Sequence, residues 1–142
     1  MSEPADRRLY FLLQRAAHQL RVTADRRLTA AAGVTSAQVG ALFAVREQPR
    51  LTQRELAAIL GQRESAITAM VGRLTDAGLL GRDTHPNQHR AVVLELTAAG
   101  AEALDRVTPE IQKFNAELRD LLGDDGFDRT ADALRKLVDW KF

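Results

Sequence analysis

The stretch that decides the fold is LTQRELAAILGQRESAITAMVGRL, residues Leu51–Leu74. Two short helices that cross at a steep angle need a small residue at the crossing and a residue that tolerates positive φ in the turn. Ala57 and Gly61 stand four residues apart in these two roles. The inner faces of both helices also need apolar side chains, and the candidates are Leu56, Leu60, Ile67, Met70 and Leu74. The pattern is typical of a helix-turn-helix, although an ordinary helical hairpin has similar apolar spacing.

Capping signals and apolar periodicity place further helices on both sides of this stretch. Thr35 with Gln38, and Thr52 with Glu55, have the spacing of capping boxes, which open helices. The helices that we predict cover about residues 6–31, 36–48, 53–60, 63–77, 98–122 and 126–140. Pro109 lies inside the helix over 98–122 and should kink or divide it, because proline removes a hydrogen bond and clashes with the preceding turn.

A β-hairpin is predicted directly after the helix-turn-helix. Two extended runs, 79–84 and 90–96, flank the turn-like segment His85-Pro86-Asn87-Gln88. Residues of the second run alternate as in a half-buried strand, with Val92, Leu94 and Leu96 on one face and Val93 and Glu95 on the other. A helix-turn-helix followed by a hairpin with a basic tip is the winged variant, whose wing enters the minor groove of DNA. Arg90 is the natural candidate for that contact, and a solvated turn is the alternative interpretation.

Length and composition allow one domain with a real hydrophobic core, since 142 residues are 45% hydrophobic and 27% charged. The chain has no cysteine, which excludes disulfides and thiolate metal sites. We expect a cytoplasmic protein, because the start of the sequence has no long apolar run. The net charge of +1 is unevenly distributed: residues 1–45 carry six arginines against three acidic residues, whereas 97–142 carry seven basic against ten acidic residues. This asymmetry fits contact with a polyanion through part of the surface, although chance also explains it.

The whole sequence resembles the MarR (multiple antibiotic resistance regulator) family, from Leu9 to Leu137. The segments that carry the resemblance are Gly33-Val34-Thr35, Leu51-Thr52-Gln53-Arg54-Glu55-Leu56-Ala57, Leu60-Gly61, Ser65-Ala66-Ile67-Thr68, Arg73-Leu74, Gly78-Leu79-Leu80 and Leu96-Thr97-Ala98-Ala99-Gly100. It implies a mainly α fold with a small β-hairpin wing, and a homodimer that binds a palindromic operator. It also implies a single domain over 1–142, with dimerisation helices at about 6–34 and 98–142 and a winged helix-turn-helix at about 35–97.

The chain departs from the family pattern in the wing and in the recognition helix. The family signature Asp-x-Arg is matched here by Gln88 and Arg90, so the arginine loses its carboxylate partner. A hydrogen bond without charge assistance is roughly half as strong. Ala66 and Ala69 stand where the family often has polar or basic residues, which favours apolar contact with thymine methyls. We therefore expect the wing to hold DNA more weakly and DNA binding to depend more on Arg63 and its helix.

The outward face of the helix over 63–77 is expected to enter the major groove. Arg63 suits a bidentate contact with guanine, whereas Gln53 and Arg73 are better placed for phosphates. Glu64 is expected to pair with a basic neighbour rather than to contact cytosine. The predicted DNA-binding residues are Gln53, Arg63, Ser65, Ala66, Thr68, Ala69, Arg73 and Arg90.

The resemblance further implies a small phenolic or anionic effector, bound between the dimer helices and the winged module. The candidate ligand-binding residues, each of which an ordinary structural role also explains, are Tyr10, Arg15, His18 and Phe43. Asp83, His85 and His89 cluster in the sequence but lack a fourth ligand, so we expect no metal and no other cofactor. The sequence has no phosphate loop, nucleophile elbow or GxGxxG motif, and we therefore expect no enzyme.

These features together predict a sequence-specific DNA-binding transcriptional regulator. We expect a homodimeric repressor of a palindromic operator, released by a small ligand. The alternative is a winged-helix module that uses the same fold to bind protein instead of DNA.

Overall fold

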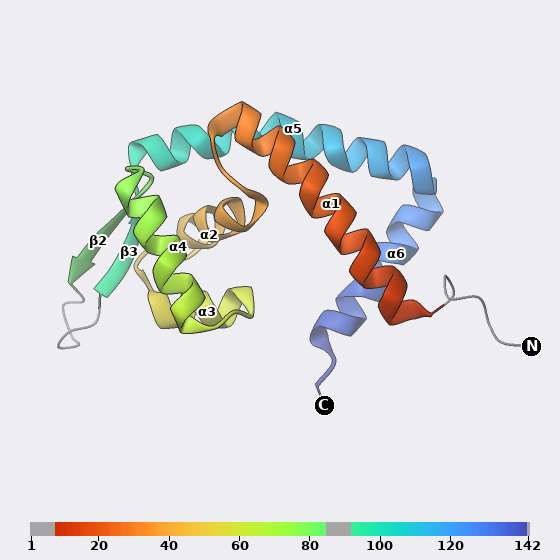
Figure 1. The fold of residues 1–142 in the computed structure, drawn as a ribbon, viewed down its shortest axis with the longest axis horizontal. Helices are drawn as coiled ribbons and strands as arrows, with labels where there is room; N and C mark the ends of the chain where they lie inside the picture. Colours follow the sequence, from red (N-terminus) through yellow and green to blue (C-terminus); the bar gives the residue numbers. More distant parts are fainter. Residues whose placement is uncertain (1–7, 85–91, 142) are drawn as a thin grey trace, which may run out of the picture. The chain divides into compact units, whose positions relative to one another are not determined.

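The computed structural model describes residues 8–84 and 92–141, which form helices and three short strands (Figure 1). The elements are α1 (Leu9–Ala32), α2 (Ser36–Glu47), β1 (Leu51–Thr52), α3 (Gln53–Leu60), α4 (Glu64–Asp76), β2 (Leu80–Thr84), β3 (Val92–Leu96), α5 (Ala98–Leu122) and α6 (Asp124–Asp139). The chain divides into two compact units, Met1–Val107 and Thr108–Phe142, so that α5 contributes to both. The expected mainly α architecture with a small β wing is confirmed.

The predicted starts of α2 and α3 are confirmed, and a capping box lies at each of them. The Thr35 hydroxyl accepts a hydrogen bond from the Gln38 amide at 3.3 Å, and Gln38 Oε1 accepts one from the Thr35 amide at 2.9 Å. Thr52 and Glu55 make the same reciprocal box before α3. Each box satisfies two amide groups that a helix N-terminus would otherwise leave without a partner. The first turns of α2 and α3 are therefore fixed by local sequence.

Pro109 does not divide the long helix, since α5 runs as one helix from Ala98 to Leu122. The proline removes a single backbone donor, and the remaining hydrogen bonds of a 25-residue helix continue on both sides of it. Packing also favours continuation, because Ala103, Leu104 and Val107 are buried just before the proline. Of the two predicted outcomes, the division was wrong, and the kink stays a prediction.

The three strands form one antiparallel sheet in the order β1-β3-β2. Leu51 of β1 lies opposite Leu94, while Arg82 of β2 lies opposite the same leucine from the other side. β1 was not predicted, because it is only two residues long and pairs with a strand some forty residues later. The predicted alternation of β3 was also wrong: Val93 and Leu94 are both fully buried, since this central strand is covered on both faces at that point.

The core of the first unit lies where α2, α3 and α4 pack against the sheet and the start of α5. Its fully buried larger side chains include Leu42, Leu56, Ile67, Leu74, Leu80, Leu94 and Leu104. Gly100 permits a close approach in this core: a Cβ there would overlap the carbonyl oxygen of Leu79 and lie 2.6 Å from Leu96 Cδ1. Only glycine fits this contact without displacing backbone.

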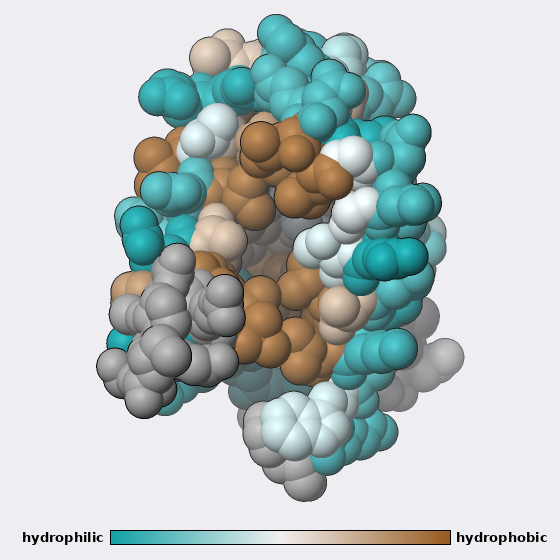
Figure 2. Space-filling view, turned by 90° about the vertical axis from the view of Figure 1, so that its right-hand side faces the viewer, coloured by the Kyte–Doolittle hydropathy of each residue, from teal (hydrophilic) through white to brown (hydrophobic). Residues whose placement is uncertain are grey.

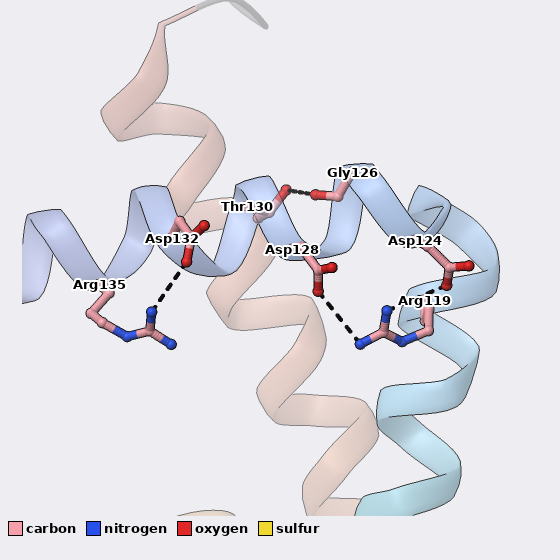
Figure 3. A network of polar contacts seen from close by, with 7 residues as sticks. All are labelled: Arg119, Asp124, Gly126, Asp128, Thr130, Asp132 and Arg135. Atoms are coloured by element: carbon pink, nitrogen blue, oxygen red, sulfur yellow. Dashed lines mark hydrogen bonds and ion pairs between the residues drawn. The ribbon is translucent and has the colours of Figure 1, made fainter.

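In the second unit, charged side chains contact one another around the turn between α5 and α6 (Figure 3). Arg119 of α5 lies 3.3 Å from an Asp124 oxygen and 3.6 Å from an Asp128 oxygen, and its guanidinium stacks 4.3 Å from the centre of the Phe127 ring. Along α6, whose residues the structure describes throughout, no side chain is buried. This unit therefore presents a helix on which the apolar residues Leu134, Leu137 and Val138 are exposed.

Helix length and hydropathy over residues 8–84 and 92–141 bear on whether the chain could cross a membrane. No single helix in this part of the chain is long and apolar enough to cross a bilayer. Among the described helices, α1 and α2 satisfy both measures when taken together, and the two are bent by 66° at the break between them.

Candidate nucleic-acid interface

The pair α3 and α4 has the local geometry of a helix-turn-helix. Gly61 ends α3 in the left-handed region with φ 63°, and the following Gln62 amide donates to the Ala57 carbonyl at 3.0 Å. Ala57 is buried at the crossing, as expected. Four of the five predicted inner-face residues are buried, and the exception is Leu60, which is half-buried beside Gly40 of α2.

The opposite face of α4 is open to solvent. Arg63 is the N-cap residue of α4 and is exposed at the start of the helix. The exposed residues of this face, all predicted from the sequence, are Arg63, Ser65, Ala66, Thr68, Ala69 and Arg73. The fully buried Ile67 and Leu74 fix the rotation of the helix about its axis. The structure thus presents these six residues together, on a helix that the core holds in place.

Gln53 of α3 is joined to this face through Thr68. The Thr68 hydroxyl lies 2.9 Å from the Glu64 carbonyl and 3.2 Å from Gln53 Oε1. A hydroxyl has one hydrogen, so it donates to one of these two oxygens at a time, and the Gln53 amide beside α4 can itself donate to phosphate. Glu64 lies 3.8 Å from the Arg54 guanidinium, which agrees with the expected pairing to a basic neighbour. Sequence reasoning did not find the Gln53–Thr68 contact, because it joins two helices whose packing decides it.

The stem of the wing is formed by β2 and β3, which pair over five residue positions from Leu80 to Thr84. Arg82 on this stem is exposed. The predicted wing contact Arg90, with its neighbours Gln88 and His89, lies outside the described residues. Within the described ranges, no cluster of three His, Cys, Asp or Glu residues could hold a metal ion.

Arg50, which sequence reasoning missed, lies at the base of the wing. Its Nη1 atom is 3.1 Å from Glu95 Oε1 and 3.6 Å from Asp83 Oδ2. Its backbone is in the left-handed region with φ 68°, which costs a residue with a side chain about 1–2 kcal/mol. The sequence gives no local signal for this contact, because its partners lie on strands far along the chain.

These elements correspond to a known family. Residues 32–91, from the end of α1 into the wing, match the model of the MarR family. The chain belongs to the MarR family. A Thauera aromatica protein named as a transcriptional regulator for the hcr operon is 34% identical over 99 residues. The match covers 67% of this MarR-family chain and 60% of that protein, so it spans less than two thirds of the relative.

Solved structures share the MarR fold of this chain nearly end to end. The PcaV regulator of Streptomyces coelicolor, in complex with its natural ligand, has 25% identity and a TM-score of 0.84, covering 98% of this chain and 97% of that one. The repressor CouR bound to a 23-mer DNA duplex has 27% identity and a TM-score of 0.86, covering 96% and 99%. CouR bound to p-coumaroyl-CoA has 26% identity and a TM-score of 0.85, covering 94% and 93%.

The predicted effector residues of this MarR-family chain are distributed along two helices. Tyr10 is 74% exposed and accepts a hydrogen bond from Gln14, and Arg15 and His18 are also exposed. Phe43 on α2 is half-buried, with the Arg46 guanidinium 4.8 Å from its ring centre. The first half of α1 extends away from α2 in Figure 1. A ligand site that uses all four residues therefore remains a prediction for an assembly of more than one chain.

A separate hollow lies beside the wing base, with a volume of about 380 Å³. Its lining residues are Val45, Arg46, Pro49, Arg50, Glu95 and Leu96. None of the four predicted effector residues lines it. The pairing of Arg50 with Glu95 leaves this hollow with charges of both signs.

Proposed function

We propose that this MarR-family protein is a cytoplasmic, sequence-specific DNA-binding repressor without catalytic activity. The observation that carries the proposal is the exposed face of α4, with Arg63 at its start, on a helix fixed by buried Ile67 and Leu74. Such a helix fits the major groove, which is wide enough to admit it. Support also comes from the similarity to the DNA-bound repressor CouR and to the Thauera aromatica regulator.

We further propose that the protein acts as a homodimer in which both units form one functional domain. Each unit, taken by itself, leaves large apolar side chains exposed, and Figure 2 draws apolar residues in brown. On α1 the exposed large apolar residues are Leu9, Tyr10, Phe11, Leu12, Leu20 and Val22. At the end of the chain they are Leu121, Leu122, Leu134, Leu137, Val138 and Trp140. Apolar surface of this extent is typical of protein interfaces. A two-fold dimer would present two α4 helices to the half-sites of a palindrome.

Within the proposed complex, each exposed residue has a distinct role. Arg63 donates to the O6 and N7 atoms of guanine, and Ala66 and Ala69 contact thymine methyls. Gln53 and Arg73 bind phosphates, which position the helix without selecting a sequence. Arg90 contacts the minor groove from the wing.

Replacing Arg63 by alanine is expected to change sequence preference. A lost bidentate contact with guanine reduces discrimination by about 1–3 kcal/mol, or roughly fivefold to 150-fold in the ratio of affinities. Mobility shifts on matched and scrambled operators measure that ratio for wild type and variant. Arg73→Ala is the matched control, since loss of a phosphate contact should weaken binding to both duplexes equally. An equal loss on both duplexes for Arg63→Ala would contradict its role in base recognition.

A winged-helix module that binds protein is the competing function, and salt dependence distinguishes the two. A protein that neutralises several phosphates releases their counterions, so its affinity for random duplex DNA falls steeply with salt. Anisotropy titrations between 50 and 200 mM salt, roughly the range over which six to ten phosphate contacts lose about 10³-fold to 10⁵-fold in affinity, measure this slope. Absence of binding at the lower concentration would favour the protein-binding module.

We propose an aromatic acid or its coenzyme A thioester as the effector, because PcaV and CouR were solved with a natural ligand and with p-coumaroyl-CoA. A ligand present at a hundred times its Kd stabilises the folded protein by about 2.7 kcal/mol, which raises Tm by several degrees. Thermal shifts with p-coumaroyl-CoA and with free aromatic acids test the proposal. If no compound raises Tm, this part of the proposed function fails.

A further inference from the structure

One guanidinium group connects both strands of the wing to the segment that opens the helix-turn-helix. Arg50 immediately precedes β1, and α3 begins at Gln53. Its Nη1 atom forms a hydrogen bond of 3.1 Å with Glu95 on β3 and lies 3.6 Å from the Asp83 carboxylate on β2. The single side chain therefore contacts both strands of the hairpin from outside it.

The backbone at Arg50 is one that glycine would adopt more easily. The other described residues with positive φ in the left-handed region are glycines, namely Gly33, Gly61, Gly78 and Gly123. Glycine reaches this conformation without steric conflict, whereas a residue with Cβ does not. An arginine therefore stands here in an unfavourable backbone conformation, and the observed contacts of its side chain are the two carboxylates of the wing stem.

The register of the sheet places the two carboxylates that Arg50 contacts on one face. Asp83 lies opposite Val93, and Glu95 follows Val93 by two residues, so both carboxylates are on the same face as diagonal neighbours. Like charges at such positions repel each other, and Arg50 neutralises one of them. The main-chain pairing of β1 with β3 covers only two residue pairs, so it constrains the stem weakly.

We propose that Arg50 is a positioning residue for DNA recognition, which fixes the β2–β3 stem relative to α3 and α4 through Glu95 and Asp83. The proposal rests on the proposed function, since it concerns how a DNA-binding wing is oriented. All three side chains are roughly half-exposed, and such ion pairs contribute little to overall stability. The effect of the cluster is therefore expected in DNA affinity rather than in the free energy of unfolding.

A direct contact between Arg50 and phosphate is the competing explanation, and the two carboxylates separate it from ours. If Arg50 only binds phosphate, removing Asp83 and Glu95 should tighten DNA binding, because two negative charges near DNA are lost. If Arg50 positions the stem, the same removal should weaken binding although the protein becomes more positive. The two explanations thus predict changes of opposite sign.

The experiment compares full-length wild type with the double variant Asp83→Ala, Glu95→Ala on the duplex that wild type enriches from random DNA. We expect roughly threefold to tenfold weaker binding, with Tm changed little, because exposed pairs stabilise weakly but orient charged groups at an interface. The matched control removes two acidic residues from α5, by Glu102→Ala with Asp105→Ala, and should bind within about twofold of wild type. Equal or tighter binding by the Asp83, Glu95 variant overturns the proposal.

A second variant tests the same contact without DNA. Arg50→Gly relieves the backbone conformation and removes the side chain, so Tm should stay the same or rise. Amide hydrogen exchange over 80–84 and 92–96 should nevertheless become faster, because the stem loses its tether. Unchanged exchange overturns the proposal. Failure of wild type to enrich any duplex is a different result, since it overturns the proposed function and leaves hydrogen exchange to decide whether Arg50 holds the stem.

Discussion

Replacing Gly100 by alanine is expected to destabilise the protein by about 2–3 kcal/mol, in the upper range for overpacking of a close contact. The added Cβ would overlap the Leu79 carbonyl oxygen and approach Leu96 Cδ1 to 2.6 Å. The backbone cannot easily move away. Leu79 O accepts from the Thr97 amide at 3.3 Å, while Thr97 Oγ1 accepts from the Gly100 amide at 2.9 Å and donates to Gly78 O at 2.7 Å. The clash therefore acts on the junction that joins α5 to the wing.

Gly72→Ala on α4 is the matched control for this prediction. Apart from the adjacent residues and the nearby backbone of α4 itself, no heavy atom lies within 4 Å of a Cβ at Gly72, and alanine favours a helix interior over glycine by about 1 kcal/mol. Denaturant unfolding followed by circular dichroism, at one protein concentration for all variants, gives the change in the free energy of unfolding for each variant. Equal stability of the two variants would contradict the packing described at Gly100.

Replacing Val138 by aspartate is expected to separate the proposed dimer. Val138 is 82% exposed on α6, so an aspartate there should not disturb the single chain. Helical spacing places it on one stripe with Phe127, Ala131 and Leu134, which we propose the partner copy covers. An unpaired charge buried there costs about 3–5 kcal/mol, which weakens dimerisation by roughly a hundredfold to several thousandfold. Sedimentation velocity at micromolar concentration measures the fractions of monomer and dimer in wild type and variant.

Arg129→Asp on the opposite side of α6 is the control for a general effect of negative charge. It alters the charge by two units, more than the Val138 variant does, and should leave the dimer intact if only the apolar stripe is covered. A monomer contacts one half-site at a time, so Val138→Asp should also weaken operator binding. A Val138→Asp protein that sediments as wild type does would contradict the assignment of this helix to the interface.

Local signals explain why the helix-turn-helix could be predicted from the sequence. The capping box of Thr52 and Glu55, the small Ala57 and the left-handed Gly61 act within a few residues of one another. The inner face of α4 also followed from apolar periodicity, and burial of Ile67 confirms it. The candidate interface is accordingly the part of the site that sequence reasoning described best.

Features that depend on distant partners could not be predicted in the same way. β1 exists because Leu51 pairs with Leu94, and the Arg50 contact joins residues 45 positions apart. The alternation expected for β3 failed because a central strand is covered on both faces, which no local pattern reveals. Pro109 was expected to kink or divide its helix. The buried side chains before it and the length of α5 instead favour one helix that continues past the proline.

Selection of bound sites from random duplex DNA, followed by the mass of the complex with the enriched duplex, tests the central claim most directly. We predict a palindromic site whose half-sites lie one helical turn apart, about 34–36 Å, occupied by two copies of the chain. Enrichment of no sequence, or of a site without two-fold symmetry that a single copy occupies, would contradict a homodimeric DNA-binding regulator.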